Sequence, residues 1–482
     1  MIRLTLLTLF VSFLAVYAWK DWYKSLCGLV ILMAVIEHPD MPKSIMGVQG
    51  LSPWNLLLAN IVLAWLVSRS REGLTWDMPR KINVLLLIYL AVVVIGFFRM
   101  MHDINRADDL ELMAKGISPS KGGLWSEYFV NTIKWSIPGL LFFSGCRSRS
   151  RFNWGITSVL GVYVFLAVQV IKWMPLGYAV SGSSLSRRSL KLLTKQIGYH
   201  RVDLSTMLAG ASWAIFSARA LVKRAAFSRL VVVTGLMVFF AQALTGGRAG
   251  YATWIMVGML LGVIRWRKFL LLGPVAIAII ALIIPGVIDR FTEGINMNND
   301  YPAHEEEVVT IGGAEVNLRV LTAGRSIAWP LVLEKIGEAP MFGYGRIAMR
   351  RTGLSSFIQE KYKDIFPHPH NAYLQLLLDN GIIGFLPIMF FYLLVIRYGV
   401  SLLCDTRNVL FVAVGGVTLS LVLAQMVASI GSQTFYLREG TVGMWCAICL
   451  MFRVHVERAR ADEALRKDPS KTMDDLIWER AR

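Results

Sequence analysis

The sequence predicts an all-α fold, a polytopic membrane helix bundle of about twelve or thirteen spanning helices with a helical cap on its periplasmic side. Hydrophobic residues make up 55% of the 482-residue chain, which is more than is usual for a soluble domain. They are also concentrated in uncharged runs, of which 82–98, 230–244 and 270–287 are the clearest. Runs of about 17 to 20 such residues match the hydrocarbon core of a bilayer and are typical of spanning helices.

The predicted spans follow one another with short connections between most of them. The second is short enough to be a re-entrant segment, so counts of about twelve and about thirteen both remain open. No A-x-A-like cleavage site follows the first, and we expect it to be retained as a helix. The predicted spans are 4–19, 25–37, 53–68, 82–98, 127–144, 153–172, 203–219, 229–245, 250–264, 269–288, 381–397, 409–430 and 441–453.

Basic residues indicate how the bundle is oriented. The formal net charge of +18 is concentrated in short connections that alternate with less basic ones. This positive-inside pattern places the basic connections (69–81, 147–151, 219–229 and 265–268) and the tail after Arg453 in the cytoplasm of a bacterial inner membrane. Topology explains most of the charge, so no nucleic-acid partner is expected. The periplasmic connections are then 38–52, 99–126, 173–202, 246–249, 290–380 and 431–440.

The chain divides into four parts. Residues 1–289 form the N-terminal part of the bundle, and residues 381–453 form its C-terminal part. Between them, 290–380 is too long for a simple turn, and amphipathic stretches such as 316–336 predict a small helical cap. Residues 454–482 form a charged cytoplasmic tail.

One periplasmic connection departs from the positive-inside pattern. Residues 173–202 contain five basic residues and no acidic one. An anionic ligand at the outer membrane surface, such as a phosphate, a diphosphate or a lipid headgroup, would account for them. Contact with the membrane lipids of the outer leaflet alone is an equal alternative. The five residues are Arg187, Arg188, Lys191, Lys195 and Arg201.

The strongest local signal is the segment Pro367–Gly384. His370 and Asn371 lie where an apolar helix begins, and Asn380-Gly381 is a good stop for that helix. An imidazole at a helix N-terminus is disfavoured in its protonated form, as a general base requires. On position alone, His370 could equally well only cap the helix.

Two other clusters have simpler explanations. Cys446 and Cys449 have redox or metal spacing but lie in an apolar span without a nearby histidine or carboxylate, which favours packing. We expect no disulfide. His304 with Glu305–Glu307 could suggest a metal site, although a solvated acidic loop tip is the better interpretation.

Three stretches together resemble the O-antigen ligase and O-antigen polymerase superfamily. His370-Asn371, Leu374, Asn380-Gly381 and Gly384 are similar to its H-N-x-x-L…G-x-x-G signature. The match covers roughly residues 230–390, and all three stretches fall in predicted periplasmic connections or at their edges. The other two stretches are Thr245–Gly250, which resembles an S/T-x-x-R-small motif, and Thr322–Trp329 followed by Pro340–Gly345, which resembles a G-R-x-x-x-W motif.

The resemblance implies a metal-independent, inverting transfer of a glycan from an undecaprenyl-diphosphate carrier, with no cofactor. Arginine binds two diphosphate oxygens at once without losing its proton, which suits a diphosphate leaving group. Arg248 and Arg325 match the family's arginines, and His370 matches its general base. The resemblance also includes Asn371, Gly324 and Gly381 as motif support, and Arg201, Arg187 and Arg188 could add to the diphosphate site.

Two alternatives stay open at this stage. A ligase would transfer the glycan to lipid A-core or protein, and a polymerase would transfer it to another lipid-linked glycan; the motifs do not separate them, and we favour the ligase. A lipid-linked glycan flippase would instead require charged residues deep in several spans. Lys134 and Asn131 are the best such residues and stand alone.

Overall fold

The computed structural model describes residues 2–45, 48–104, 121–292, 308–311, 314–431 and 434–478. These residues form helices almost throughout, and two antiparallel hairpins hold the strands of this described part. The hairpins are β1–β2 (Ser44–Ile45 and Val48–Gln49) and β3–β4 (Val308–Ile311 and Ala314–Asn317). The predicted all-α membrane bundle is confirmed.

The first third of the chain contains long helices and one broken stretch. The predicted span at 127–144 is interrupted around Trp135 and Ser136. Pro138 lies in the first turn of the helix that follows and has no N–H to continue the preceding one. The helices are α1 (Ile2–Tyr17), α2 (Trp22–Ile31), α3 (Pro53–Arg71), α4 (Arg80–Asp103), α6 (Lys121–Leu124), the π-helical η3 (Trp125–Val130), α7 (Asn131–Lys134), α8 (Ile137–Gly145) and α9 (Arg149–Trp173).

The middle of the chain begins with an amphipathic helix inside the basic connection 173–202. The predicted span at 269–288 is also shorter than expected, because Pro285 separates it into two helices. The helices are α10 (Gly182–Gln196), α11 (Arg201–Ala218), α12 (Ala225–Leu244), α13 (Arg248–Ile264), α14 (Leu272–Ile283) and α15 (Gly286–Phe291).

Four shorter helices fill the described part of 290–380, and longer ones follow. A helix starting after Asn371 runs into the predicted span at 381–397, with a break in its backbone angles only at Gly381. The helices are α16 (Leu318–Thr322), α17 (Arg325–Glu338), α18 (Ala348–Arg351), α19 (Leu354–Tyr362), α20 (Ala372–Leu403), α21 (Val409–Ala428), α22 (Val442–Lys467) and α23 (Met473–Leu476).

Helix α21 is the centre of the bundle. Among the described residues, five helices are long and apolar enough to cross a membrane, namely α4, α9, α12, α20 and α21. The apolar window of α21 is 89% buried, against 33–50% for the other four, because α11, α13, α20 and α22 all pack against it. Shorter apolar helices cover residues 4–17, 22–34, 248–264 and 273–283.

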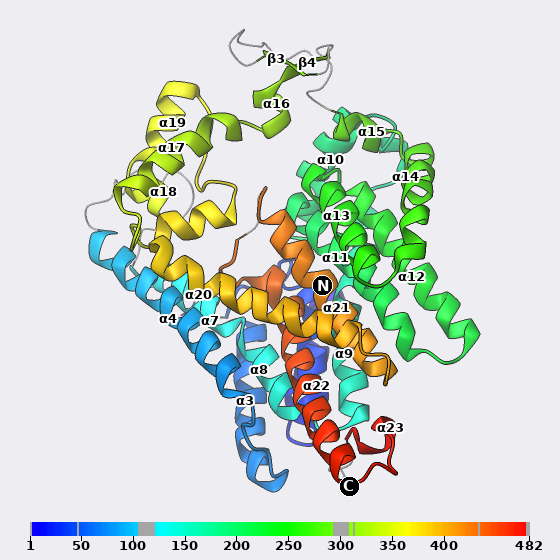
Figure 1. Ribbon diagram of the computed structural model, residues 1–482. Helices are drawn as coiled ribbons and strands as arrows, with labels where there is room; N and C mark the ends of the chain where they lie inside the picture. The colour runs from blue at the N-terminus through cyan, green and yellow to red at the C-terminus, as the bar shows by residue number, and fades with distance from the viewer. Residues whose placement is uncertain are drawn as a thin grey trace.

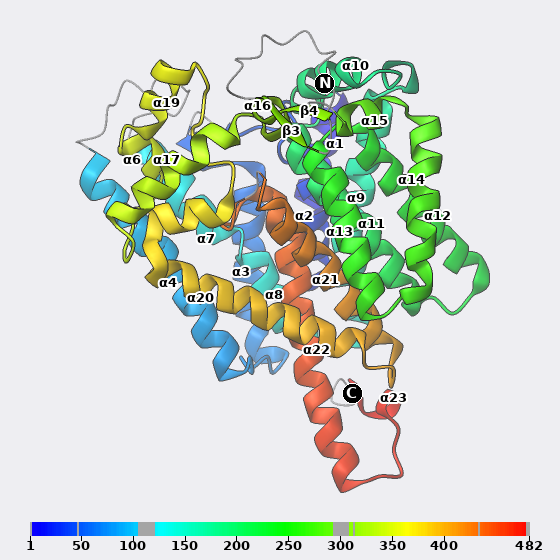
Figure 2. The same cartoon turned by 45° about the horizontal axis from the view of Figure 1, so that its top comes forward.

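The two ends of the bundle differ in character. Helices α16, α17 and α19 lie at one end, together with α10 and α15, whereas α23 and the C-terminal end of α22 lie at the other (Figures 1 and 2). This arrangement agrees with the prediction that the cap and the charged tail face opposite sides of a membrane.

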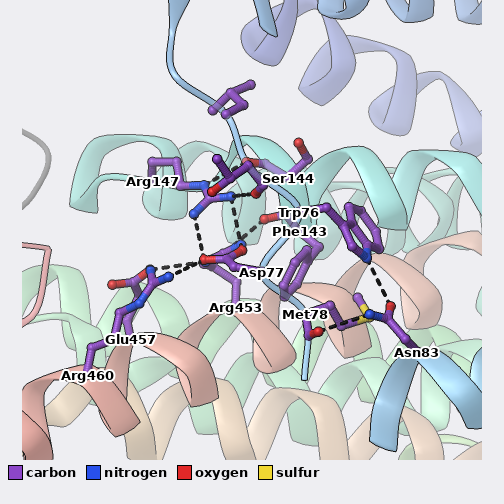
Figure 3. A network of polar contacts seen from close by, with 12 residues as sticks. Trp76, Asp77, Met78, Asn83, Phe143, Ser144, Arg147, Arg453, Glu457 and Arg460 are labelled. Carbon is purple, nitrogen blue, oxygen red and sulfur yellow. Dashed lines mark hydrogen bonds and ion pairs between the residues drawn. The ribbon is translucent and has the colours of Figure 1, made fainter. Parts of the chain in front are cut away.

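A buried ion cluster ties the tail end together (Figure 3). Asp77, between α3 and α4, pairs with Arg147 at 2.9 Å and also with Arg453 and Arg460. Arg453 is fully buried and lies 3.1 Å from Glu457. Burial alone would raise the pKa of Asp77, but its pairs with Arg453 and Arg147 outweigh burial and lower it. The cluster therefore joins the α3–α4 connection, the end of α8 and α22.

Candidate active site

Asn371 caps the N-terminus of α20. Its side-chain oxygen accepts hydrogen bonds from the backbone N–H groups of Tyr373 (3.0 Å) and Leu374 (3.2 Å), as capping asparagines do. The backbone N–H of Ala372 donates to the carbonyl of Ser429, just beyond α21 (2.8 Å). The start of α20 is thereby fixed both to its own first turn and to the end of the central helix.

His370 precedes this cap and has a left-handed backbone, with φ of 51°, which is uncommon for a residue other than glycine. Its backbone N–H donates to Nδ1 of His368 (3.3 Å), and the two imidazole centroids are 4.2 Å apart. The ring of Phe366 meets His370 edge-on at a centroid distance of 5.5 Å. The turn thus holds the His370 ring between two aromatic neighbours beside a helix N-terminus.

Arg325 begins α17, directly after Gly324. Its Nη1 donates to the carbonyl of Thr322 (2.8 Å) and its Nη2 to the carbonyl of Gly431. These bonds use two of the five N–H donors of a guanidinium, and its buried Nε has no partner among the described residues. No carboxylate in the described part of the chain forms a salt bridge with Arg325. The side chain is therefore anchored by neutral carbonyls and keeps its charge uncompensated.

The Arg325 motif also supports the His370 motif directly. The indole N–H of Trp329 donates to the carbonyl of Pro369 (3.0 Å), next to His370. Gly324 has φ of +77°, and a Cβ there would lie 3.1 Å from the Phe366 ring. Glycine is required at this point both by the backbone conformation and by the close approach. Two motifs that are 40 residues apart in the sequence thus form one structural unit.

Arg248 is the first residue of α13, which packs closely on α11. A Cβ at Gly250 would lie only 1.8 Å from Oγ of Ser205, so the alternative role of these glycines in helix packing is real. A Cβ at Gly431 would lie 3.8 Å from Cβ of Ala249. Because Gly431 also accepts a hydrogen bond from Arg325, its loop brings the first turn of α13 near Arg325.

The electrostatic environment of this unit is positive. Burial and, after it, the positive charge of Arg248 lower the pKa of Arg325. The pKa of His370 is lowered to about 3, mainly by burial and then by the charges of His368, Arg325 and His200. His370 is therefore neutral at physiological pH, in the direction that the helix position predicts, although burial is the main cause.

Arg201 and His200 begin α11. Nη1 of Arg201 donates to Oγ of Ser186 (2.7 Å) and thereby joins α10 to α11. The ring of His200 caps α11 by accepting from the N–H of Val202 (3.4 Å). Since the charge of His200 affects His370, the N-terminus of α11 lies in the same electrostatic neighbourhood.

Arg187 and Arg188 lie apart from this unit. Arg187 is exposed on α10. The guanidinium carbon of Arg188 lies 3.6 Å from the ring centroid of Tyr178. In the described part of the chain neither side chain contacts His370 or Arg325, so their role in binding diphosphate remains a prediction.

Gly381 lets α20 dock on the preceding loop. Its angles (φ 61°, ψ −170°) are accessible only to glycine, and a Cβ would lie 2.3 Å from the backbone of Met341. The break frees backbone groups that the loop then uses: Tyr344 N–H donates to the Leu378 carbonyl (2.9 Å), and Ile382 N–H donates to the Pro340 carbonyl (2.9 Å). Asn380-Gly381 and the Pro340–Gly345 segment are thus one interlocked feature.

Arg438 and Arg350 belong to this positive region, and the sequence did not single them out. Both charges help to lower the pKa of His368 to about 4, after burial, which is the largest cause. Arg438 is paired with Asp203 of α11 at 2.8 Å. Neither lies in a recognisable motif, so only spatial proximity identifies them.

The metal and redox alternatives gain no support from the described residues. No group of three His, Cys, Asp or Glu side chains that could hold a metal ion occurs there. His304 and Glu305–Glu307 lie outside the described residues. Cys446 and Cys449 are free and buried, and a Cβ at Gly139 of α8 would lie 3.0 Å from Sγ of Cys449, which agrees with packing.

Comparisons with known proteins agree with the motifs. Residues 230–389 match a family model described as O-antigen ligase. A protein of Rickettsia conorii that carries the name "Putative polysaccharide ligase" is 27% identical over 170 residues. That alignment covers 34% of this chain and 37% of the Rickettsia protein. The predicted superfamily resemblance is therefore confirmed for the region that holds Arg248, Arg325 and His370.

Proposed function

We propose, from the membership of residues 230–389 in the O-antigen ligase family, that this membrane protein transfers a glycan from an undecaprenyl-diphosphate carrier to an acceptor hydroxyl. The observation that carries the proposal is the pairing of Arg325, a buried cation without a carboxylate partner in the described chain, with His370, a neutral imidazole. One suits a diphosphate, and the other suits the proton of a hydroxyl.

Arg248 and Arg325 bind the diphosphate of the donor. Each is the first residue of a helix, so the positive end of the helix dipole adds to its charge. Negative charge accumulates on the diphosphate as the glycosidic bond breaks, and guanidinium groups stabilise it without giving up a proton. Arg201, Arg187 and Arg188 extend the positive surface toward the incoming lipid.

His370 is the general base of the transfer. It takes the proton of the acceptor hydroxyl while that oxygen forms a bond to the anomeric carbon. The bond between the anomeric carbon and the diphosphate oxygen breaks, and its electron pair leaves with the diphosphate. A single attack from the opposite face inverts the anomeric centre, and no step requires a metal ion or a cofactor.

Binding of the donor prepares the base. A pKa of about 3 makes His370 a weak base in the free protein. A bound diphosphate brings negative charge next to Arg325, whose positive charge helps to hold that pKa down. The pKa of His370 therefore rises when the donor binds, and the base becomes stronger in the complex that uses it.

The acceptor and the location follow from the same arrangement. With the cap end of the bundle in the periplasm, the prenyl tail stays in the inner membrane while the glycan reaches the site. We favour a ligase that uses lipid A-core or a protein as the acceptor, with a polymerase of the same superfamily as the second candidate. The two residues that could favour a flippase are bound locally: Lys134 donates to Asn55 (3.1 Å) and Asn131 to Glu127 (2.9 Å).

An assay with the purified protein tests the proposal. Undecaprenyl-diphosphate-linked glycan is supplied with lipid A-core, with a protein acceptor or with a second lipid-linked glycan, in the presence of a chelator. Product in the first or second arm supports a ligase, and product in the third supports a polymerase. Donor consumption in no arm, with a folded protein, would reject glycan transfer.

A further inference from the structure

A second arginine pair, Arg346 and Arg350, lies near the two histidines but outside the three motifs. Arg346 is only 7% exposed, and its guanidinium carbon lies 3.3 Å from the ring centroid of Tyr436. Among the described residues its Nε and Nη1 have no hydrogen-bond partner. A buried charged donor without a partner is costly for a fold, so its presence calls for an explanation.

Arg350 repeats this feature on α18. Its Nε and Nη1 are also buried, and no described residue accepts from them. The neighbouring Arg351 differs, because its Nε donates to the Arg346 carbonyl (3.0 Å), its Nη1 to Asp103 (3.3 Å) and its Nη2 to the Tyr344 carbonyl. The fold therefore satisfies one arginine of this segment and leaves donors unused on two.

The nearby carboxylate of Asp379 is already occupied. One oxygen accepts from the backbone N–H of Ala348 (3.1 Å), and the other accepts from the Tyr436 hydroxyl (2.9 Å). That hydroxyl in turn accepts from Asn380 (2.6 Å). Asp379 thus orients the ring on which Arg346 stacks, and the unused N–H groups of Arg346 need an acceptor from outside the described residues.

The position of this pair relative to His370 is informative. Arg350 is close enough to help lower the pKa of His368, whose ring is 4.2 Å from that of His370. The segment that holds the pair is attached to α4, since the N–H of Arg346 donates to the carbonyl of Gly96 (3.0 Å). Helices α4 and α17 lie on one side of the molecule, and α11 and α13 lie on the other (Figures 1 and 2). The pair therefore approaches the histidines from the side opposite Arg248.

We infer that Arg346 and Arg350 form a second anion-binding subsite, which holds a phosphoryl group of the acceptor. The inference rests on the proposed function, in which the donor diphosphate occupies Arg248 and Arg325 and the acceptor hydroxyl must reach His370. Guanidinium groups with free N–H donors recognise phosphate oxygens in this way. The phosphoryl group belongs to a phosphorylated saccharide such as lipid A-core for a ligase, or to the diphosphate of a second lipid-linked glycan for a polymerase.

The test uses the full-length protein and compares Arg350→Gln with the wild type. Transfer is measured with lipid A-core before and after phosphatase treatment, and with a second lipid-linked glycan, while donor and acceptor are varied separately. Lys361→Gln, at an exposed lysine of α19, is the matched control. Arg346→Lys is the second variant, because it keeps the charge over Tyr436 but loses the fork.

We expect Arg350→Gln to raise the KM for the phosphorylated acceptor about ten- to a hundred-fold, the usual effect of losing charge-assisted hydrogen bonds. The KM for the donor should stay within about two-fold of the wild-type value, and the dephosphorylated acceptor should not distinguish the two proteins. Arg346→Lys should give a smaller change in the same direction. Sensitivity with only one acceptor type identifies the source of the phosphoryl group.

Direct binding separates failure of this inference from failure of the proposed function. Thermophoresis without donor measures the Kd for phosphorylated and dephosphorylated lipid A-core and for the lipid-linked glycan. A phosphate-dependent loss in Arg350→Gln supports the subsite even if the wild type catalyses no transfer. Equal Kd and KM values in the variant and the wild type, or an equal loss with the dephosphorylated acceptor, would overturn it.

Discussion

His370 and Arg325 are each held by backbone groups, and neither depends on a carboxylate of the described chain. The imidazole is placed by a left-handed turn and an asparagine cap, and the guanidinium is placed by two carbonyls. A carboxylate partner would raise the pKa of His370 and would compete with a diphosphate for Arg325. The site is therefore built to stay positive and to keep its base neutral.

Replacing His370 tests the base assignment. We expect His370→Ala to lose about 10² to 10⁴ in turnover with little change in donor binding, because only proton removal is lost. His368→Ala is the matched control and should cost far less. If the His368 variant is the inactive one, the assignment has the wrong histidine, and if a chelator also abolishes activity, the two histidines are better interpreted as metal ligands.

The pH profile provides an independent check on the same residue. A neutral imidazole is the active form, so activity falls as the pH drops through its pKa. The acid limb of kcat/KM reports the free protein and should lie well below 6.5, since the pKa there is about 3. The acid limb of kcat should lie at higher pH, because the bound diphosphate raises the pKa. Coincident limbs near 6.5 would contradict both the buried site and the coupling.

Lysine substitutions test the arginines. Arg325→Lys and Arg248→Lys keep the charge but lose the planar fork, so we expect the KM for the donor to rise about ten-fold or more in each. Arg187→Lys, at an exposed position on α10, is the comparison that should change little. Near-normal kinetics in both Arg325→Lys and Arg248→Lys, with normal expression, would remove them as diphosphate ligands.

At the level of elements, the sequence predicts the long apolar helices well and their interruptions poorly. Hydrophobic runs identified α4, α9, α12 and α21, because a bilayer demands a continuous apolar length. The breaks before α8 and before α15 depend on single prolines that a window average conceals. For the site, the motifs identified Arg248, Arg325 and His370, whose roles stay predictions. Arg350 and Arg438 could not be found, since only the folded chain brings them near His368.

The break in α20 leads to a test at this scale. In Gly381→Ala the new Cβ would meet the Met341 backbone at 2.3 Å, and the backbone angles would be strained by about 1–3 kcal/mol. We expect a lower Tm in detergent together with lower activity, because the loop that joins α17 to α18 loses its dock. Gly273→Ala on α14 is the control, since its Cβ would meet nothing within 4 Å. Equal Tm values for the two variants would contradict the interlock.

At the level of the whole molecule, the proposal requires the cap to face the periplasm. Cys404 is exposed at the end of α20, in a connection that the positive-inside pattern places in the cytoplasm. We expect it to resist an impermeant thiol reagent in intact spheroplasts and to react after permeabilisation. A cysteine in place of Ser183 on α10, in a Cys404→Ser background, should react in intact spheroplasts. The reverse pattern would place His370 on the wrong side of the membrane for a periplasmic acceptor.

The ion cluster around Asp77 has a consequence for biogenesis. A membrane chain emerges from the ribosome with its N-terminus first, so Asp77 and Arg147 are inserted long before Arg453 is made. Until the last long helix arrives, the carboxylate has one of its three guanidinium partners, and the bundle stays open at that end. Closing the cluster then acts as a check on completed synthesis, which a truncated chain ending before Arg453 cannot pass and which leaves such a chain to the cell's membrane proteases.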